Sequence, residues 1–392
     1  MSELAIDGGA PLNTDSWPAW PPPATAEQRS LLDGVLESGE WGSTSGPLCQ
    51  RLADRFAQVH DAGYGVSLTN GTIALFVALR AAGVGPGDEV IVPAYTFVAC
   101  ATSVLLLGAT PVIADVDAEH LHLSAATIEQ ALSARTRAVM VVHLAGSPAP
   151  MTEIMSLAGA HDLVVIEDSA QAHGARYRER PVGGIGTAGT FSFQSSKAMT
   201  AGEGGLVVTN DAAVAESAWS LCNVGRERDG AWYHHATVGW NLRMTELQAA
   251  LLLPWLDRLD GEIDARERFC QRFRAALAQS PSGAIAVPDP DGTTRNSRHL
   301  LMVSLPQQVD RHWVAQALAA EGVPVDLGYP ALGSIDVIAR QSRVLPIPNL
   351  TSVGSSLLWL RQSMLMADED AAERAASAFS KVLADSRAWR NA

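Results

Sequence analysis

The chain has 392 residues, of which 47% are hydrophobic and 18% are charged. This length exceeds that of one ordinary domain, and the composition is typical of a globular protein and argues against extended disorder. The formal net charge of -14 argues against partners such as nucleic acid or an anionic membrane surface, because no run of Lys or Arg forms a basic patch.

Residues 1–24 are rich in proline and are predicted to form an irregular N-terminal arm that leads into a helix beginning near Thr25. For the tryptophans of this region, local packing is favoured over a lid or a subunit contact: Trp17, Trp20 and Trp41. No secretory signal begins the chain and no apolar run reaches membrane-spanning length, so we expect a cytoplasmic protein. The four cysteines are scattered, without the close pairs of a disulfide framework or metal site.

Between Gly63 and Asp211, short apolar runs alternate with helical stretches. The predicted strands are 64–68, 89–93, 110–116, 137–144 and 162–168. The predicted helices are 71–82, 97–107, 124–133 and 151–160. Because each strand is nearly all apolar, the pattern predicts a doubly wound α/β domain with a mostly parallel sheet, whose ligands bind at the carboxyl ends of the strands.

After Asp211 the pattern predicts a helix to about Cys222, a polar loop, and a long helix from Met244 to about Ala278. Further predicted elements are strands at 298–305 and 323–327 and a closing amphipathic helix at 368–387. We therefore divide the chain into the arm (1–24), a large α/β domain (25–255) and a smaller α+β domain (256–392).

Two strand ends carry candidate binding residues. At the first, the chain turns through Asn70, Gly71 and Thr72 into a helix, whose free amides and dipole suit a phosphate, although simple helix capping is an alternative. At the next, Phe97 could stack on a planar heterocycle or pack in the core.

Two further clusters carry candidate catalytic residues. Asp168 ends an apolar strand, where a carboxylate suits pairing with a protonated pyridine nitrogen, as in pyridoxal phosphate (PLP), or could cap a helix. Lys197 lies between an apolar strand and a Gly-rich turn, where partial burial would lower its pKa and make it a nucleophile. Taken alone, such a lysine could also be a solvated surface residue.

Four segments in this order resemble the DegT/DnrJ/EryC1/StrS aminotransferases, which are fold type I PLP enzymes. They are GDEVIVPAYTF at 87–97, EDSAQAHGA at 167–175, SFQSSKAMTAGEGG at 192–205 and GWNLRMTELQAALL at 239–252. The resemblance covers nearly the whole chain and implies the fold type I architecture, with the large sheet domain followed by the small one.

The resemblance also implies roles for individual residues. Lys197 is expected to hold PLP as a Schiff base and then to act as general acid and base. Asp168 is expected to pair with the pyridine nitrogen, Gln171 to lie near the ring oxygen, and Phe97 to stack on the ring.

For the cofactor's phosphate, the resemblance implies Gly71, Thr72 and Ser192. Asn241 is similar to the family residue that reaches the phosphate of the neighbouring subunit, so a homodimer with shared active sites is expected.

The chain departs from the family pattern at two places. Pro150 and Thr152 replace two acids of a local turn, and Gln362 stands in WLRQ where relatives often have His. The second departure affects expected substrate contacts. His173 and Arg243 are weaker candidates for the pocket, since each could equally be structural.

The expected reaction moves an amino group from L-glutamine or L-glutamate to a keto-cyclitol or keto-sugar in secondary, antibiotic-type metabolism. Alternatives are a PLP dehydratase like 3-amino-5-hydroxybenzoate synthase and a nucleotide-ketosugar aminotransferase. More distant alternatives are an inactive regulatory partner and a nucleotide-phosphate site without PLP.

Overall fold

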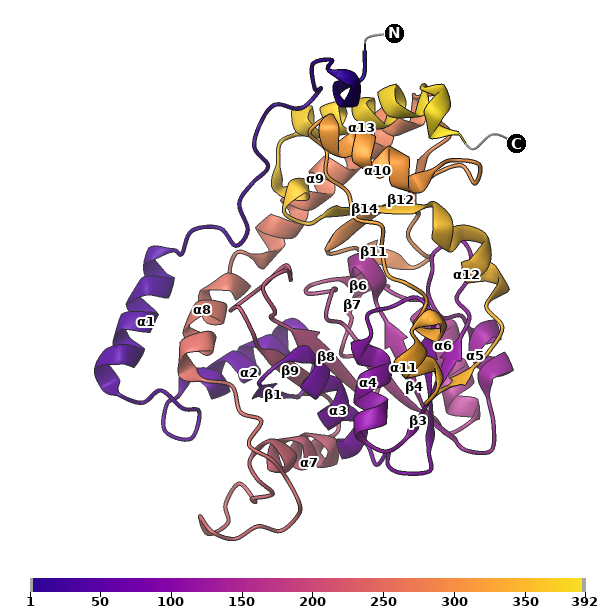
Figure 1. The fold of residues 1–392 in the computed structure, drawn as a ribbon. Coiled ribbons are helices and arrows are strands. Elements are labelled where there is room, and N and C mark those ends of the chain that lie inside the picture. Colours follow the sequence, from indigo (N-terminus) through magenta and orange to yellow (C-terminus); the bar gives the residue numbers. More distant parts are fainter. Residues whose placement is uncertain (1–2, 390–392) are drawn as a thin grey trace.

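An eight-stranded sheet forms the centre of the larger part of the molecule in the computed structural model, which describes residues 3–389 (Figure 1). Its order is β1-β9-β8-β5-β4-β2-β3-β13; β9 runs antiparallel to both neighbours, and the remaining pairs are parallel. The strands are β1 (Tyr64–Leu68), β2 (Glu89–Pro93), β3 (Thr110–Ala114), β4 (Thr136–Val142), β5 (Val164–Asp168), β8 (Ala188–Ser192), β9 (Gly205–Thr209) and β13 (Arg343–Val344). The mostly parallel sheet predicted from the apolar runs is confirmed.

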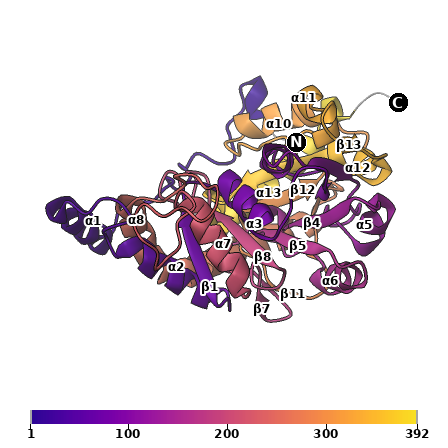
Figure 2. The ribbon, with the colours of Figure 1, turned by 90° about the horizontal axis from the view of Figure 1, so that it is seen from below.

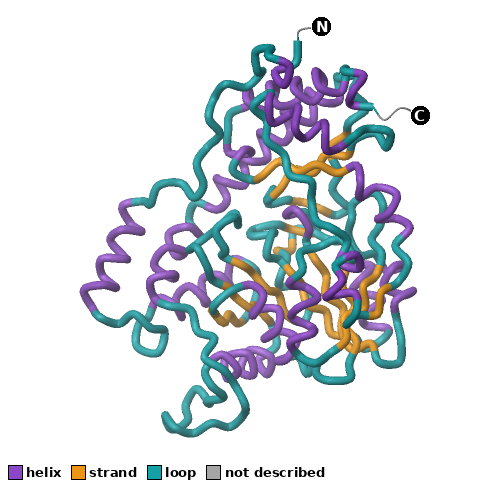
Figure 3. Tube along the Cα trace, viewed as in Figure 1, coloured by secondary structure: helices purple, strands orange, loops and turns teal. Residues whose placement is uncertain are grey.

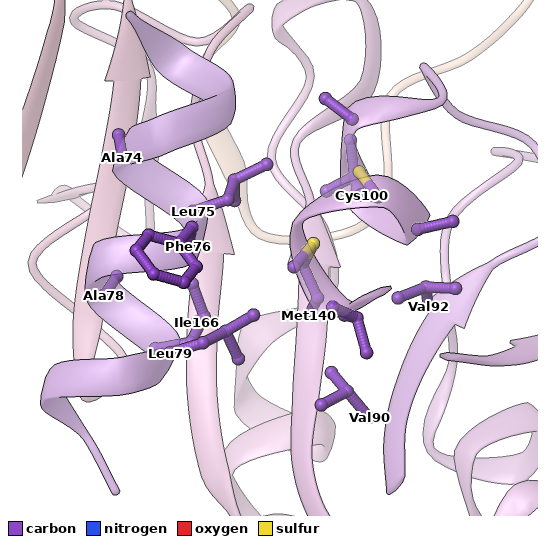
Figure 4. Packing of buried hydrophobic residues seen from close by; sticks show 14 of the residues in the cluster. Ala74, Leu75, Phe76, Ala78, Leu79, Val90, Val92, Cys100, Met140 and Ile166 are labelled. Atoms are coloured by element: carbon purple, nitrogen blue, oxygen red, sulfur yellow. The ribbon is translucent and has the colours of Figure 1, made fainter. Parts of the chain in front are cut away.

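Helices cover both faces of this sheet, as Figures 1 and 2 show. One face carries α3 (Gly71–Ala81), α4 (Ala99–Leu106) and α7 (Ala212–Cys222). The other carries α2 (Leu48–Val59), α5 (Ala125–Ala131), α6 (Met151–Ala160) and α8 (Glu246–Leu256). Figure 4 shows Leu75 and Leu79 of α3 beside Ile166 and Met140 of the sheet. Alternate residues of each strand therefore pack into different layers, as the two-residue period of a strand requires.

The smaller part of the molecule packs helices on a three-stranded antiparallel sheet (Figure 3). Its elements are α9 (Leu259–Ala278), β10 (Ile285–Ala286), β12 (Leu300–Ser304), α10 (Arg311–Ala320), β14 (Leu357–Arg361) and α13 (Glu369–Leu383). The closing helix predicted at 368–387 is confirmed as α13. A third small sheet has β6 (Arg176–Tyr177), β7 (Arg180–Pro181) and β11 (Thr293–Arg295).

Two predicted elements of the C-terminal half are wrong. The long helix from Met244 to Ala278 is two helices, α8 and α9, separated at Asp257 and Arg258. Pro254 lacks an amide hydrogen near the end of α8, which weakens the last turn, whereas the apolar pattern continues across the break. Residues 323–327 form no strand; Asp326 makes only an isolated bridge to Trp359, on the edge of β14 opposite to the edge that pairs with β12.

Two segments link the parts. The N-terminal arm lies along the smaller part, where Leu4, Leu12 and Trp17 pack on its core, before Thr25 caps α1 (Ala26–Ser38). The short helices α11 (Asp336–Ala339) and α12 (Pro348–Val353) return to the large sheet, where β13 pairs with β3. The predicted division near residue 255 stays a prediction. Within residues 3–389, none of the helices combines the length and apolarity needed to cross a membrane.

Candidate active site

A cavity of about 630 Å³ lies at the carboxyl ends of β5 and β8 and the amino end of α3. All of the predicted site residues except Asn241 line it: Gly71, Thr72, Phe97, Asp168, Gln171, Ser192 and Lys197. The position agrees with the rule that ligands bind beyond the carboxyl ends of parallel strands.

Lys197 lies in a turn after β8, where its amide donates to the Gln194 carbonyl at 2.9 Å. Its side chain is half-buried and lines the cavity, so the alternative of a solvated surface lysine is wrong. Burial lowers the pKa of Lys197, and the nearby Asp168 carboxylate acts in the opposite direction. A larger share of Lys197 is therefore unprotonated at neutral pH than for an ordinary lysine.

Glu167 and Asp168 are neighbours on β5, and strand alternation sends their side chains to opposite faces. Glu167 is fully buried, and its carboxylate accepts from the His143 ring at 2.9 Å and from the backbone amides of Gly183, Ile185 and Gly186. Burial acts to raise the pKa of Glu167, but these donors outweigh it and hold the pKa below 4.5. Glu167 is thus structural, whereas Asp168 faces the cavity.

Asp168 is held by local contacts. Its Oδ1 accepts from the Ala170 amide at 3.1 Å in a turn, and no helix begins there, so the capping alternative is wrong. Its Oδ2 accepts from the Cys100 thiol at 3.2 Å. Burial and the Asp168 charge raise the pKa of Cys100 well above its ordinary value, so the sulfur stays protonated. No local pattern singles out Cys100, because helix spacing alone does not show which strand α4 meets.

The amino end of α3 forms an anion cradle. Asn70 caps the helix by accepting from the Ile73 amide at 3.0 Å, while no described residue accepts from the amide of Gly71 or Thr72. A Cβ added at Gly71 would lie 2.6 Å from the Ser192 Cβ, so only glycine allows this approach. Capping and a free anion site therefore coexist at this helix end.

Gln171 and Phe97 meet Tyr329, which the sequence did not single out. The Gln171 amide accepts from Ala145 N at 2.7 Å and donates to Tyr329 Oη at 3.1 Å. Phe97 is 50% exposed, with its ring 6.0 Å from that of Tyr329, so the core-packing alternative for Phe97 is wrong. A half-exposed ring beside a carboxylate, an amine and an anion cradle suits a planar heterocycle that carries a phosphate and a carbonyl group.

Three predicted candidates lie outside this cavity. Asn241 is exposed and bridges Asn223 in the loop between α7 and α8, which projects from the body (Figures 1 and 3). Arg243 lines a different cavity with Arg226, and His173 is buried beside Phe191, so neither of these weaker candidates lines the cavity within one subunit. The role of Asn241 toward a second subunit stays a prediction.

A second cavity of about 590 Å³ adjoins the first and shares Gln194, Ser196, His299 and Tyr329 with it. We call it the distal cavity. Its remaining walls come largely from the arm and the smaller part: Trp20, Asp326, Trp359, Arg361 and Gln362. Trp20 also packs on Trp255 at 5.5 Å, and Trp17 on Phe269 at 6.4 Å, which confirms local packing of these tryptophans. Trp41 is 54% exposed.

Comparison with known proteins places this geometry in context. The sequence profile of the DegT/DnrJ/EryC1/StrS aminotransferase family matches residues 23–378. The L-glutamine:2-deoxy-scyllo-inosose aminotransferase of Micromonospora echinospora is 37% identical, with 100% of both chains covered. The L-glutamine:scyllo-inosose aminotransferase of Streptomyces griseus is 40% identical over 79% of this chain and 75% of its own.

A solved structure of 3-amino-5-hydroxybenzoic acid synthase is also similar. It has a TM-score of 0.89 and 32% identity, and the match covers 94% of this chain and 99% of that one. The shared fold includes the large sheet on which the cavity is built.

Proposed function

The chain belongs to the DegT/DnrJ/EryC1/StrS aminotransferase family and is an aminotransferase, and we propose that it uses PLP to move an amino group from L-glutamine to a keto-cyclitol. The observation that carries the proposal is the pairing of Lys197 and Asp168 in one cavity beside the anion cradle of α3. The substrate class is supported by relatives that are named L-glutamine:inosose aminotransferases and that match this chain over most of their length.

The lining residues fit the cofactor. The amides of Gly71 and Thr72, with Ser192, would hold its phosphate at the helix amino end. Asp168 would hold a proton on the pyridine nitrogen, and the Cys100 thiol keeps that carboxylate oriented. When bound, PLP supplies an electrophilic aldehyde carbon and a ring that withdraws electrons from the carbon bearing the transferred nitrogen.

Lys197 performs the proton transfers in this proposal. Its Nζ would hold the cofactor and, as a free amine, would accept the proton of the donor's α-carbon and give that proton to the cofactor carbon that bears the transferred nitrogen. The lowered pKa suits this task, because a general base must be unprotonated near the working pH. Gln171, fixed by Ala145 and Tyr329, can orient the ring's polar substituent without moving itself.

A homodimer completes the proposed site. The projecting loop between α7 and α8 exposes large apolar side chains, including Trp232, Tyr233 and Trp240. Such a surface suits burial against a second copy, which would bring Asn241 toward the neighbour's anion cradle. The cytoplasmic location stays a prediction.

A second candidate is a dehydratase like 3-amino-5-hydroxybenzoate synthase, which the similarity in fold favours. The two reactions differ at the substrate, since one product keeps its ring hydroxyl groups and the other is aromatic. Product analysis with each ketone distinguishes them. The same product analysis distinguishes a nucleotide-ketosugar aminotransferase, which would aminate a nucleotide-linked ketosugar instead of a keto-cyclitol.

The chain contains only two lysines, Lys197 and Lys381, which makes the first experiment unusually sharp. Holoenzyme should show a visible absorption band that shifts to the near ultraviolet with L-glutamine. Borohydride reduction followed by peptide mass mapping should label Lys197 alone. Lys197→Ala should abolish both effects.

The matched control is Lys381→Arg, because Lys381 pairs with Glu321 at 2.8 Å in the smaller part and arginine keeps that charge. This variant should retain the band and its shift. A wild-type protein that forms no band with added PLP would overturn the proposed function.

A further inference from the structure

Gln362 has a buried side chain whose amide oxygen has no hydrogen-bond partner among the described residues. It is 3% exposed and lines the distal cavity, and no described residue hydrogen-bonds its Oε1. Two further polar atoms on residues around this cavity share the property within residues 3–389: Trp20 Nε1 and His299 Nδ1. Buried polar groups in proteins are nearly always hydrogen-bonded, so this concentration indicates groups awaiting a ligand.

The other buried glutamines provide an internal comparison. Gln28 is 3% exposed and has both amide atoms bonded, to Thr25 N at 2.9 Å and to the Leu251 carbonyl at 2.7 Å. Gln171 is 4% exposed and is likewise bonded at both ends. Gln362 is equally buried but has neither bond. The fold can therefore satisfy a buried glutamine, and it leaves this one free beside a cavity.

Charge limits what the ligand can be. Arg361 is the sole cationic arginine or lysine lining the distal cavity among residues 3–389, and Asp326 holds it through two bonds of 2.6 and 2.7 Å. Burial and the nearby Lys197 lower the pKa of His299 well below its ordinary value, so that ring is neutral. A ligand with a carboxylate or phosphate would be repelled by the Asp326 carboxylate, and no unpaired cation would neutralise it. A ligand hydroxyl, in contrast, can donate to a carboxylate and exchange hydrogen bonds with an amide.

We propose that Gln362 is a specificity-determining residue that selects an uncharged, polyhydroxylated ring as amino acceptor, an inference that rests on the aminotransferase function proposed above. The acceptor's ring hydroxyls exchange hydrogen bonds with the Gln362 amide in the distal cavity. Its carbonyl group extends into the first cavity toward Lys197. The residues shared by the two cavities, including His299 and Tyr329, line the passage between them.

Equilibrium binding to holoenzyme tests the proposal without turnover. The probe is scyllo-inositol, an uncharged ring with no carbonyl to aminate, compared with shikimate, a carboxylated ring, and UDP-glucose, a diphosphate. By calorimetry, scyllo-inositol should bind more tightly than either. Gln362→Leu should weaken its binding about 10-fold or more, because an unmatched hydroxyl is then buried.

Two controls keep the outcome interpretable. Gln341→Leu alters an exposed glutamine that bonds only the Val337 carbonyl of its own turn, and it should bind scyllo-inositol like wild type. Gln362→Met, which is closer in shape, should reproduce the loss if Gln362→Leu folds poorly.

The proposal is overturned if scyllo-inositol fails to bind wild type, if the Gln362 variants bind it normally, or if shikimate or UDP-glucose binds more tightly. Loss of the glutamine-induced shift in wild type would instead reject the proposed function itself. The two failures are therefore distinguishable.

Discussion

The two adjoining cavities differ in how their polar groups are satisfied. In the first cavity, Asp168 and Gln171 are fixed by protein hydrogen bonds, to Ala170 and Cys100 in one case and to Ala145 and Tyr329 in the other. In the distal cavity, the Gln362 amide oxygen and the ring nitrogens Trp20 Nε1 and His299 Nδ1 have no such partners among the described residues. Groups that must hold a permanent cofactor are preorganised, whereas groups that meet a transient substrate are left unpaired until it arrives.

The largest expected effect comes from a substitution among the preorganised groups of the first cavity. Asp168→Asn should lower kcat of the glutamine half-reaction by about 10²- to 10⁴-fold, because an amide cannot hold a proton on the facing ring nitrogen. Stopped-flow absorbance measures this rate. Asp326→Asn, the matching acid-to-amide change in the distal cavity, should leave the rate of the glutamine half-reaction within about threefold of wild type. An equal loss of rate in both variants would contradict the distinction between the two cavities.

Glu167 tests whether the acid on the opposite face of β5 is purely structural. Glu167→Gln should lower the free energy of unfolding by about 3 kcal/mol, because the new side-chain amide group is itself a donor and would face backbone amides that also donate. The folded pKa of Glu167 lies below that of an ordinary glutamate, so its stabilisation is present above the ordinary pKa and is lost as pH falls through the folded pKa. The gap between variant and wild type in urea denaturation should therefore narrow at acid pH; a gap constant to pH 3 would contradict this assignment.

The buried glutamines sharpen the comparison through stability. Gln171→Leu leaves Ala145 N unpaired and should cost about 1–3 kcal/mol of unfolding free energy. Gln362→Leu removes an amide that has no described partner and should cost nothing or stabilise the protein slightly. Chemical denaturation of the two variants measures the contrast. Similar destabilisation by both would indicate that Gln362 serves the fold.

The smallest expected effect concerns charge in the distal cavity. Asp326→Asn releases the Arg361 guanidinium from its two bonds, so the affinity for shikimate should rise about threefold to fivefold, as befits a mostly exposed ion pair. Titration calorimetry in low salt would detect it. Unchanged shikimate binding would show that the Asp326–Arg361 pair does not exclude anions.

Much of the first cavity could be predicted because its signals are local. Apolar runs that end near Asn70 and at Asp168 place those residues at the carboxyl edge of one parallel sheet, since parallel strands share that edge, whereas Ser192 was implied by the family resemblance. Lys197 follows from the same pattern. Asp168 was singled out at the end of its strand, whereas the structural role of the neighbouring Glu167 appears only in the fold, which turns its carboxylate toward His143 on the opposite face.

The sequence by itself thus determined the sheet and several residues at its strand ends, because turn chemistry and apolar periodicity act over a few neighbouring residues. The family followed from the resemblance of four longer motifs. Only the tertiary structure decided the distal cavity. Its walls join the arm at Trp20, the turn at Tyr329 and the end of β14 at Gln362, which no local pattern connects. It also decided that Cys100 meets Asp168 and that Gln362 is buried without a partner, because both depend on how distant segments pack.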